Sequence, residues 1–104
     1  MLEAQSFKIY VLEQLSGLSE VSCRAMFGGH GLYCSKRFFG ILHRGRLYLK
    51  TDTTTRRHYI RAGSKPFQPS PDQTLGSYYE VPAAILEDAP ALQTWAAQAA
   101  AIEK

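Results

Sequence analysis

Short apolar runs separated by turn sequences fill residues 24–50, and this pattern limits the fold more than any other feature of the chain. The runs are too short for helices, and their spacing is typical of strands joined by tight connections. Strands with such short connections pair antiparallel, because a parallel pair needs a long crossover. The sequence therefore predicts an antiparallel meander of three or four strands. The intervening turns are Gly28-Gly29-His30-Gly31, Ser35-Lys36-Arg37 and Arg44-Gly45.

The run at residues 46–50 indicates how the two faces of the sheet differ. Leu47 and Leu49 would share one face of a strand, since successive side chains in a strand point to opposite sides. One face is thus predicted to be buried, and the other to be basic and aromatic. The residues expected on that second face are Arg46, Tyr48 and Lys50.

Three segments have the periodicity of amphipathic helices. The first spans residues 3–15 and ends at Ser16-Gly17. The second spans residues 51–62, and the third starts at Asp88 and Pro90. Asp52 or Thr53 would cap the second helix, and Gly63 would end it. The expected apolar stripes are Phe7, Tyr10, Val11 and Leu15 in the first helix and Leu92, Trp95, Ala96 and Ala99 in the third.

The stretch before the last helix is richer in turn residues. Residues 65–77 hold three prolines and one glycine and are predicted to form a loop. Residues 78–81 predict a last strand, and residues 83–87 a short helix that follows Pro82. The expected fold is an α+β two-layer sandwich in which helices back an antiparallel sheet, in α-β-β-β-α-β-α order. A chain of 104 residues predicts a single domain over residues 1–104.

The chain shows neither a membrane span nor a signal peptide. The Ala-rich stretch at residues 81–102 is interrupted by Glu87, Asp88 and Pro90. The first residues lack the basic and apolar regions of a secretory signal. Cys23 and Cys34 are therefore expected to be reduced thiols, and the protein is expected to be cytoplasmic.

The net charge of +3 conceals a strong asymmetry. Residues 24–65 contain ten basic side chains and one acid, whereas the rest of the chain contains two basic side chains and eight acids. A basic middle between acidic ends predicts a positive face for an anionic partner. The alternative is that the acidic ends fold back over the basic segment and neutralise it.

Little in the sequence predicts catalysis. The carboxylates are scattered, and no Gly-x-Ser-x-Gly or Cys-His signature groups a nucleophile with a base. The glycines at residues 28–31 lack the following helix and the lysine of a phosphate-binding loop. We interpret them as a bend where strands approach closely, and we expect no catalytic residue and no cofactor.

Four zinc-competent side chains fall within one stretch of the chain. Their spacing fits no known zinc pattern, and strand alternation would place them on both faces of the sheet. No metal site is therefore expected. The four are Cys23, His30, Cys34 and His43.

Basic side chains form the most serious candidate site. Seven of them could contact phosphates on a nucleic acid. Tyr33 and Tyr48 could stack on bases if their faces are exposed. The alternative is a solvated basic face. The candidate basic face comprises Lys36, Arg37, Arg46, Lys50, Arg56, Arg57 and Arg61.

One set of motifs closely resembles the N-terminal domain of the TfoX/Sxy family, over about residues 7–100. The most distinctive part is Arg24-x-Met26-Phe27-Gly28-Gly29-His30-Gly31-Leu32-Tyr33. The motif residues singled out are Arg24, Met26, Phe27, Gly28, Gly29 and Gly31. The other matching parts are Phe38-Phe39, the run at residues 45–52, Ala62-Gly63-Ser64-x-Pro66-Phe67 and Tyr78-Tyr79-Glu80-Val81-Pro82.

The resemblance implies a two-layer α+β fold and a link to bacterial competence regulation. The founding members are positive regulators that act with the cyclic-AMP receptor protein at promoters. They carry a second, C-terminal domain that this sequence lacks, so a stand-alone N-terminal domain is expected. The family supplies no catalytic residues. Its motif residues could also serve only to form a turn and fill the core beneath it.

Three hypotheses follow for the function. The first is a non-enzymatic regulatory domain that binds a protein partner, a transcription regulator, and DNA through its basic face. The second is a protein-interaction or homodimerisation module without a nucleic-acid role. The third is a small-molecule-binding enzyme at the bend of residues 28–31, which requires a concave pocket with convergent polar groups.

Overall fold

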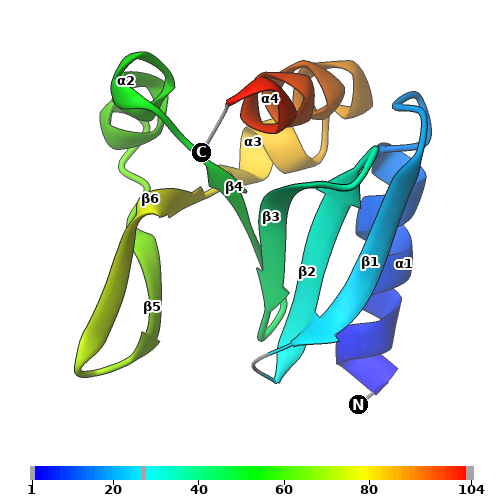
Figure 1. The fold of residues 1–104 in the computed structure, drawn as a ribbon, viewed down its shortest axis with the longest axis horizontal. Coiled ribbons are helices and arrows are strands. Elements are labelled where there is room, and N and C mark those ends of the chain that lie inside the picture. The colour runs from blue at the N-terminus through cyan, green and yellow to red at the C-terminus, as the bar shows by residue number, and fades with distance from the viewer. Residues whose placement is uncertain (1, 27, 103–104) are drawn as a thin grey trace.

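A six-stranded antiparallel sheet and four helices make up the computed structural model, which describes residues 2–26 and 28–102 (Figure 1). The sheet order is β1-β2-β3-β4-β6-β5. Phe27 of the sequence motif lies outside the described residues. The helices are α1 (Leu2–Gln14), α2 (Thr53–Arg61), α3 (Ala83–Leu86) and α4 (Ala89–Ala101). The strands are β1 (Val21–Met26), β2 (Gly29–Cys34), β3 (Arg37–His43), β4 (Arg46–Lys50), β5 (Pro66–Ser70) and β6 (Gln73–Glu80).

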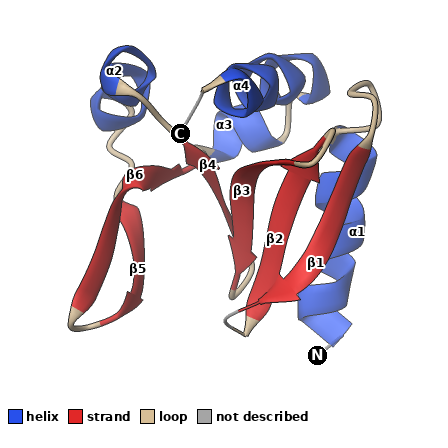
Figure 2. Ribbon diagram, viewed as in Figure 1, coloured by secondary structure: helices blue, strands red, loops and turns tan. Residues whose placement is uncertain are grey.

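The predicted α+β class, with helices backing an antiparallel sheet, is confirmed (Figure 2). The predicted meander corresponds to β1 to β4, each strand paired with the next. The main core lies between this meander and the helices. Leu92, Ala96 and Ala99 of the predicted α4 stripe are buried in it, as are Val11 of α1 and Leu15, which directly follows α1. None of the helices in the described part of the chain is long and apolar enough to cross a membrane.

The loop predicted over residues 65–77 is wrong. This stretch forms β5 and most of β6, joined by a turn at residues 71–72. Pro66 and Pro69 misled the prediction because proline cannot donate to a strand ladder. Both lie in β5, which is the outermost strand of the sheet and pairs only with β6. An outer strand tolerates prolines because one of its two sides needs no partner.

The hairpin of β5 and β6 encloses a second, smaller core. Ile41, Tyr48 and Phe67 are buried there, and Phe38, Leu75 and Tyr78 pack against them. An irregularity in the pairing of β2 with β3 lies where Leu32 pairs with Gly40 and Tyr33 with Phe38. The extra residue, Phe39, turns to the main core and leaves Phe38 and Ile41 to the second one. The basic and aromatic face predicted for β4 is therefore covered at Tyr48.

Capping residues set the start of the two helices that follow loops. The Asp52 side chain accepts a hydrogen bond of 2.8 Å from the Thr55 N–H and caps α2, as predicted. Gly63 follows the end of α2 with a φ of 84°, a conformation that glycine adopts without strain. Asp88 caps α4 in the same way through the N–H of Ala91. Asp52 and Gly63 thus fix where the basic helix α2 begins and ends.

Candidate nucleic-acid interface

Most of the predicted basic residues lie at one end of the sheet. Lys36 and Arg37 stand at the turn between β2 and β3, and Lys50 is the last residue of β4. Gly40 of β3 pairs with Leu49 of β4. Because the strands are antiparallel, Lys50 lies beside Phe39. Arg37 is therefore only two positions further along β3. Strand pairing brings together side chains that are 13 residues or more apart in the sequence.

The end of α4 lies between these strands and α2. The Arg37 side chain donates to the carbonyl oxygen of Ala100 over 3.3 Å. Ile102 lines a hollow of about 320 Å³ together with Lys50 and Arg56. A cation at the C-terminal end of a helix is stabilised by the unpaired carbonyls there. Arg37 is thus positioned by α4, while Lys50 and Arg56 border the neighbouring hollow.

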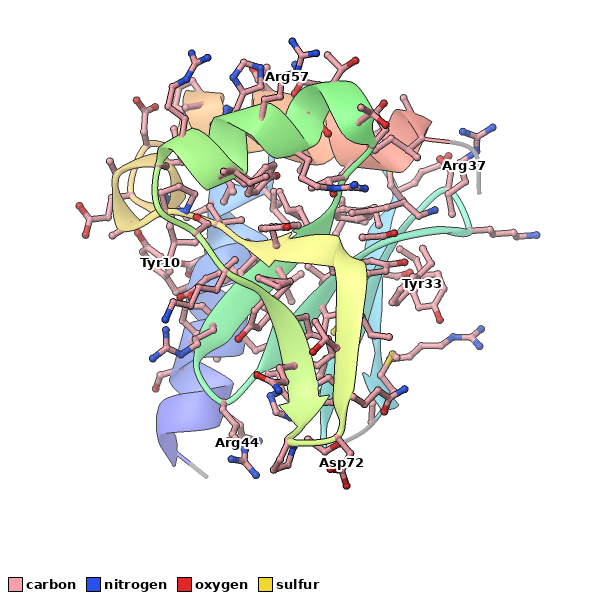
Figure 3. All side chains as sticks on the ribbon, turned by 90° about the vertical axis from the view of Figure 1, so that its left-hand side faces the viewer. Tyr10, Tyr33, Arg37, Arg44, Arg57 and Asp72 are labelled. Carbon is pink, nitrogen blue, oxygen red and sulfur yellow. The ribbon has the colours of Figure 1, made fainter. Side chains whose placement is uncertain are left out.

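Helix α2 adds Arg56, Arg57 and Arg61 to the basic surface. Hydrogen bonds to Thr51 hold the Arg56 side chain in place. The guanidinium of Arg56 donates to the hydroxyl oxygen of Thr51 over 3.0 Å and to its carbonyl oxygen over 3.4 Å. Thr51 is only 3% exposed, and its hydroxyl donates to Ser77 over 2.9 Å. Arg57 and Arg61 are one turn apart and exposed. Figure 3 shows Arg57 on the outer side of α2. We call Lys36, Arg37, Lys50, Arg56, Arg57 and Arg61 the basic end.

Arg46 does not belong to the basic end. It stands at the opposite end of β4 from Lys50, and its guanidinium pairs with the Glu80 carboxylate at 2.9 Å. Its side chain is 59% exposed, so the pair contributes little to stability. Lys36, Arg37, Lys50 and Arg56 are therefore brought to one end, α2 adds Arg57 and Arg61 on its exposed side, and Arg46 is paired elsewhere.

Two acids of the described residues lie close to the basic end, and both have hydrogen-bonding roles. Glu20 accepts a bond of 2.6 Å from the hydroxyl of Ser35, next to Lys36. Asp52 caps α2. Neither forms an ion pair with a member of the basic end within the described residues. Among residues 2–26 and 28–102, six cations and two carboxylates give this end a positive excess.

Asp52 leads to a prediction about pH. The hydrogen bond from the Thr55 N–H holds the pKa of the Asp52 carboxyl below its usual value. A lowered folded-state pKa stabilises the fold above the unfolded-state pKa, and this contribution is lost as the pH falls through the folded-state value. Asp52→Asn keeps a capping oxygen but cannot titrate. Thermal unfolding should show wild type slightly more stable than Asp52→Asn at about pH 7 and equal to it near about pH 2. A difference that does not change with pH would contradict this role.

The aromatic partners expected for bases are only partly available. Tyr48 is buried in the second core, which excludes it as a stacking platform. Tyr33 is half-buried, its ring 5.2 Å from that of Phe38. The guanidinium of Arg24 lies 5.8 Å from the centroid of the Tyr33 ring, an arrangement that favours cation–π attraction. Arg24 of β1 thus contacts Tyr33 and is not a member of the basic end.

Close packing explains the glycines of the sequence motif. An ideal Cβ on Gly31 would lie 2.5 Å from the Met26 sulfur and 2.7 Å from the ring of Phe38. A Cβ on Gly29 would overlap the carbonyl oxygen of Leu42. Gly28 has a φ of 73° in the turn between β1 and β2. Gly29 and Gly31 thus let β1, β2 and β3 approach one another, while Gly28 allows the positive φ of the turn, as the bend interpretation requires.

The cysteines and histidines do not gather at one point. Cys23 and Cys34 are free thiols. The ring of His43 lies 5.1 Å from that of Phe67, in contact with the second core. Across residues 2–26 and 28–102, three or more His, Cys, Asp or Glu side chains never lie together in a way that could hold a metal ion.

Thr51 is the residue of this end that sequence reasoning missed. It is the one buried polar side chain in the described part of the chain, and it links Arg56 to Ser77 in β6. The local signal is a threonine five positions before an arginine at the start of a helix. Its partner in β6 could not be anticipated, because residues 73–77 were predicted as loop.

Comparison with known proteins identifies one family. Residues 13–102 match the TfoX N-terminal domain, which is nearly the whole chain. A search of curated proteins found no match to this chain. The matched region contains every member of the basic end and the turn between β1 and β2.

Proposed function

The chain belongs to the family of TfoX N-terminal domains, and we propose that it is a non-enzymatic regulatory domain that binds duplex DNA through the basic end. The observation that carries this proposal is that three segments present six cations, while the two nearby carboxylates among the described residues are engaged in hydrogen bonds. Phosphate contacts of this kind place a protein on the duplex without reading its sequence. A transcription regulator as protein partner would supply the choice of promoter.

Salt-dependent DNA binding is the expected result. About four phosphate contacts would weaken binding about a hundredfold between about 50 and about 200 mM salt, because counterions are released on binding. Anisotropy of a labelled duplex of arbitrary sequence measures this directly. The variant to compare carries Lys36→Gln, Arg57→Gln and Arg61→Gln, whose side chains are exposed. We expect it to bind at least about tenfold more weakly and with a shallower salt dependence.

A charge-matched variant makes the test specific. Arg24→Gln, Arg44→Gln and Lys65→Gln remove the same three charges from exposed positions outside the basic end. This variant should keep most of the affinity if the basic end is the interface. Equal losses in the two variants, or no binding at about 50 mM salt, would remove DNA from the proposal.

One observation favours a second function, homodimerisation. The edge strand β1 pairs on one side only, with β2, along six residues. Such an edge can pair with a second strand, and a two-fold axis would join two copies antiparallel. Sedimentation velocity distinguishes the two functions. A dimer that shows no DNA binding would favour the interaction module, and a monomer that binds DNA would favour the basic end.

A further inference from the structure

A small hollow of about 60 Å³ lies at the end of the sheet opposite the basic end. It is bordered by the turn between β1 and β2, the turn between β3 and β4, and helix α1. Figure 3 shows Arg44, at the second of these turns, far from Arg37 and Arg57. The hollow is therefore separate from the proposed DNA interface. It also lies at the glycine bend where a binding enzyme would need a pocket.

The charge of this hollow is positive. Lys8 of α1 and Arg44 border it, and no described residue that lines it is acidic. The imidazole of His30 also borders the hollow. Because His30 is two positions before the buried Leu32 in β2, both side chains lie on the helix-covered side of the sheet. His43 also borders the hollow, but its ring packs against Phe67. Burial, and then the charge of Arg44, lower the pKa of His43 below its usual value. Lys8 and Arg44 are the two lining residues that are cationic at neutral pH.

Two open turns expose the backbone at the hollow. Gly28 and Gly45 each have a φ of 73°, and Arg44 has a φ of 53°. A Cβ built on Gly28 or on Gly45 would meet no atom within 4 Å. Bare turns let a ligand approach the peptide N–H groups, which favour anions. Three separate segments thus surround the hollow with cationic or open backbone groups.

We propose that this hollow binds the phosphate group of a small molecule. Lys8 and Arg44 neutralise the dianion, and peptide N–H groups among Gly28, Gly29, Arg44 and Gly45 complete its coordination. A tetrahedral group suits donors that come from three segments, whereas a planar carboxylate uses donors within one plane. The proposal is independent of the DNA interface, because Lys8 and Arg44 are not members of the basic end.

An NMR titration of the ¹⁵N-labelled protein with inorganic phosphate tests the proposal, with chloride added to keep the ionic strength constant. We expect saturable shifts of the amides of Gly28, Gly29, Arg44 and Gly45. Lys8→Gln and Arg44→Gln should each weaken the affinity about tenfold, because each removes one charge-assisted contact. Lys36→Gln, an equal loss of charge at the basic end, should leave it unchanged. A spectrum with wild-type dispersion confirms that each variant is folded.

A second arm of the titration identifies the source of the phosphate. Glycerol phosphate that binds more tightly than inorganic phosphate would assign the site to a phosphomonoester, and the reverse order would assign it to the free ion. Either order supports the site. Shifts that do not saturate, that centre on the basic end, or that persist in both Lys8→Gln and Arg44→Gln would overturn it.

Discussion

Replacement of Gly29 by alanine should destabilise the domain by about 3 kcal/mol or more, which is a large part of the stability of a small domain. The added Cβ would overlap the carbonyl oxygen of Leu42 and lie 3.1 Å from its carbonyl carbon and 3.3 Å from Cα of His43. All three are backbone atoms of β3. The strand cannot shift away, because the Leu42 side chain is held in the main core at 4% exposure.

Other glycines provide graded controls in the same urea-denaturation experiment. A Cβ on Gly31 meets the ends of two side chains, which can turn aside, so Gly31→Ala should cost less than Gly29→Ala. Gly76 in β6 has nothing within 4 Å, and Gly76→Ala should stay within about 0.5 kcal/mol of wild type. If Gly29→Ala and Gly76→Ala unfold at the same urea concentration, close strand approach is not the reason for the motif glycine.

The second large effect is expected at Phe67. Its side chain is fully buried, 4.7 Å from the Tyr48 ring and 5.1 Å from that of His43, measured between centroids. Truncation of a buried phenylalanine typically costs about 3–5 kcal/mol. Phe67→Ala removes the only β5 residue buried in the second core. We expect a loss of about 3 kcal/mol, whereas Gln68→Ala on the exposed neighbouring position should be nearly neutral.

Hydrogen exchange would show where Phe67→Ala acts. The hairpin of β5 and β6 joins β4 through three pairs only, from Tyr48 to Lys50. Loss of the second core should therefore raise exchange in β5 and the first half of β6, and leave the amides of α1 and α4 protected. Uniformly faster exchange across the whole domain would mean that the two cores unfold as one unit.

Local features of the sequence predict much of this fold. The turn at residues 44–45, the cap at Asp52 and the stripe of α4 depend on residues near one another in the chain, and each lies where the sequence predicts it. The turn predicted at residues 28–31 is shorter than expected, because Gly29, His30 and Gly31 already belong to β2. The prolines of β5 are the exception. Their meaning depends on the position of the strand at the edge of the sheet, which no local pattern reveals.

The candidate site depends more on contacts between distant residues. The pattern of charge picks out the basic side chains, but it does not separate Arg46 from the others. That separation comes from Glu80, 34 positions away. In the same way, Arg37 is held by Ala100, 63 positions away. The covering of Tyr48 requires both the irregular pairing of β2 with β3 and the hairpin of β5 and β6.

The two edges of the sheet limit how copies of this domain could assemble. On β5, two of five positions are prolines, which offer no N–H to an incoming strand. On β1, six consecutive residues lack proline and pair on one side only. A molecule with one receptive edge and one unreceptive edge can gain a single neighbour by strand pairing. Such growth ends at a closed pair and cannot continue into a fibre.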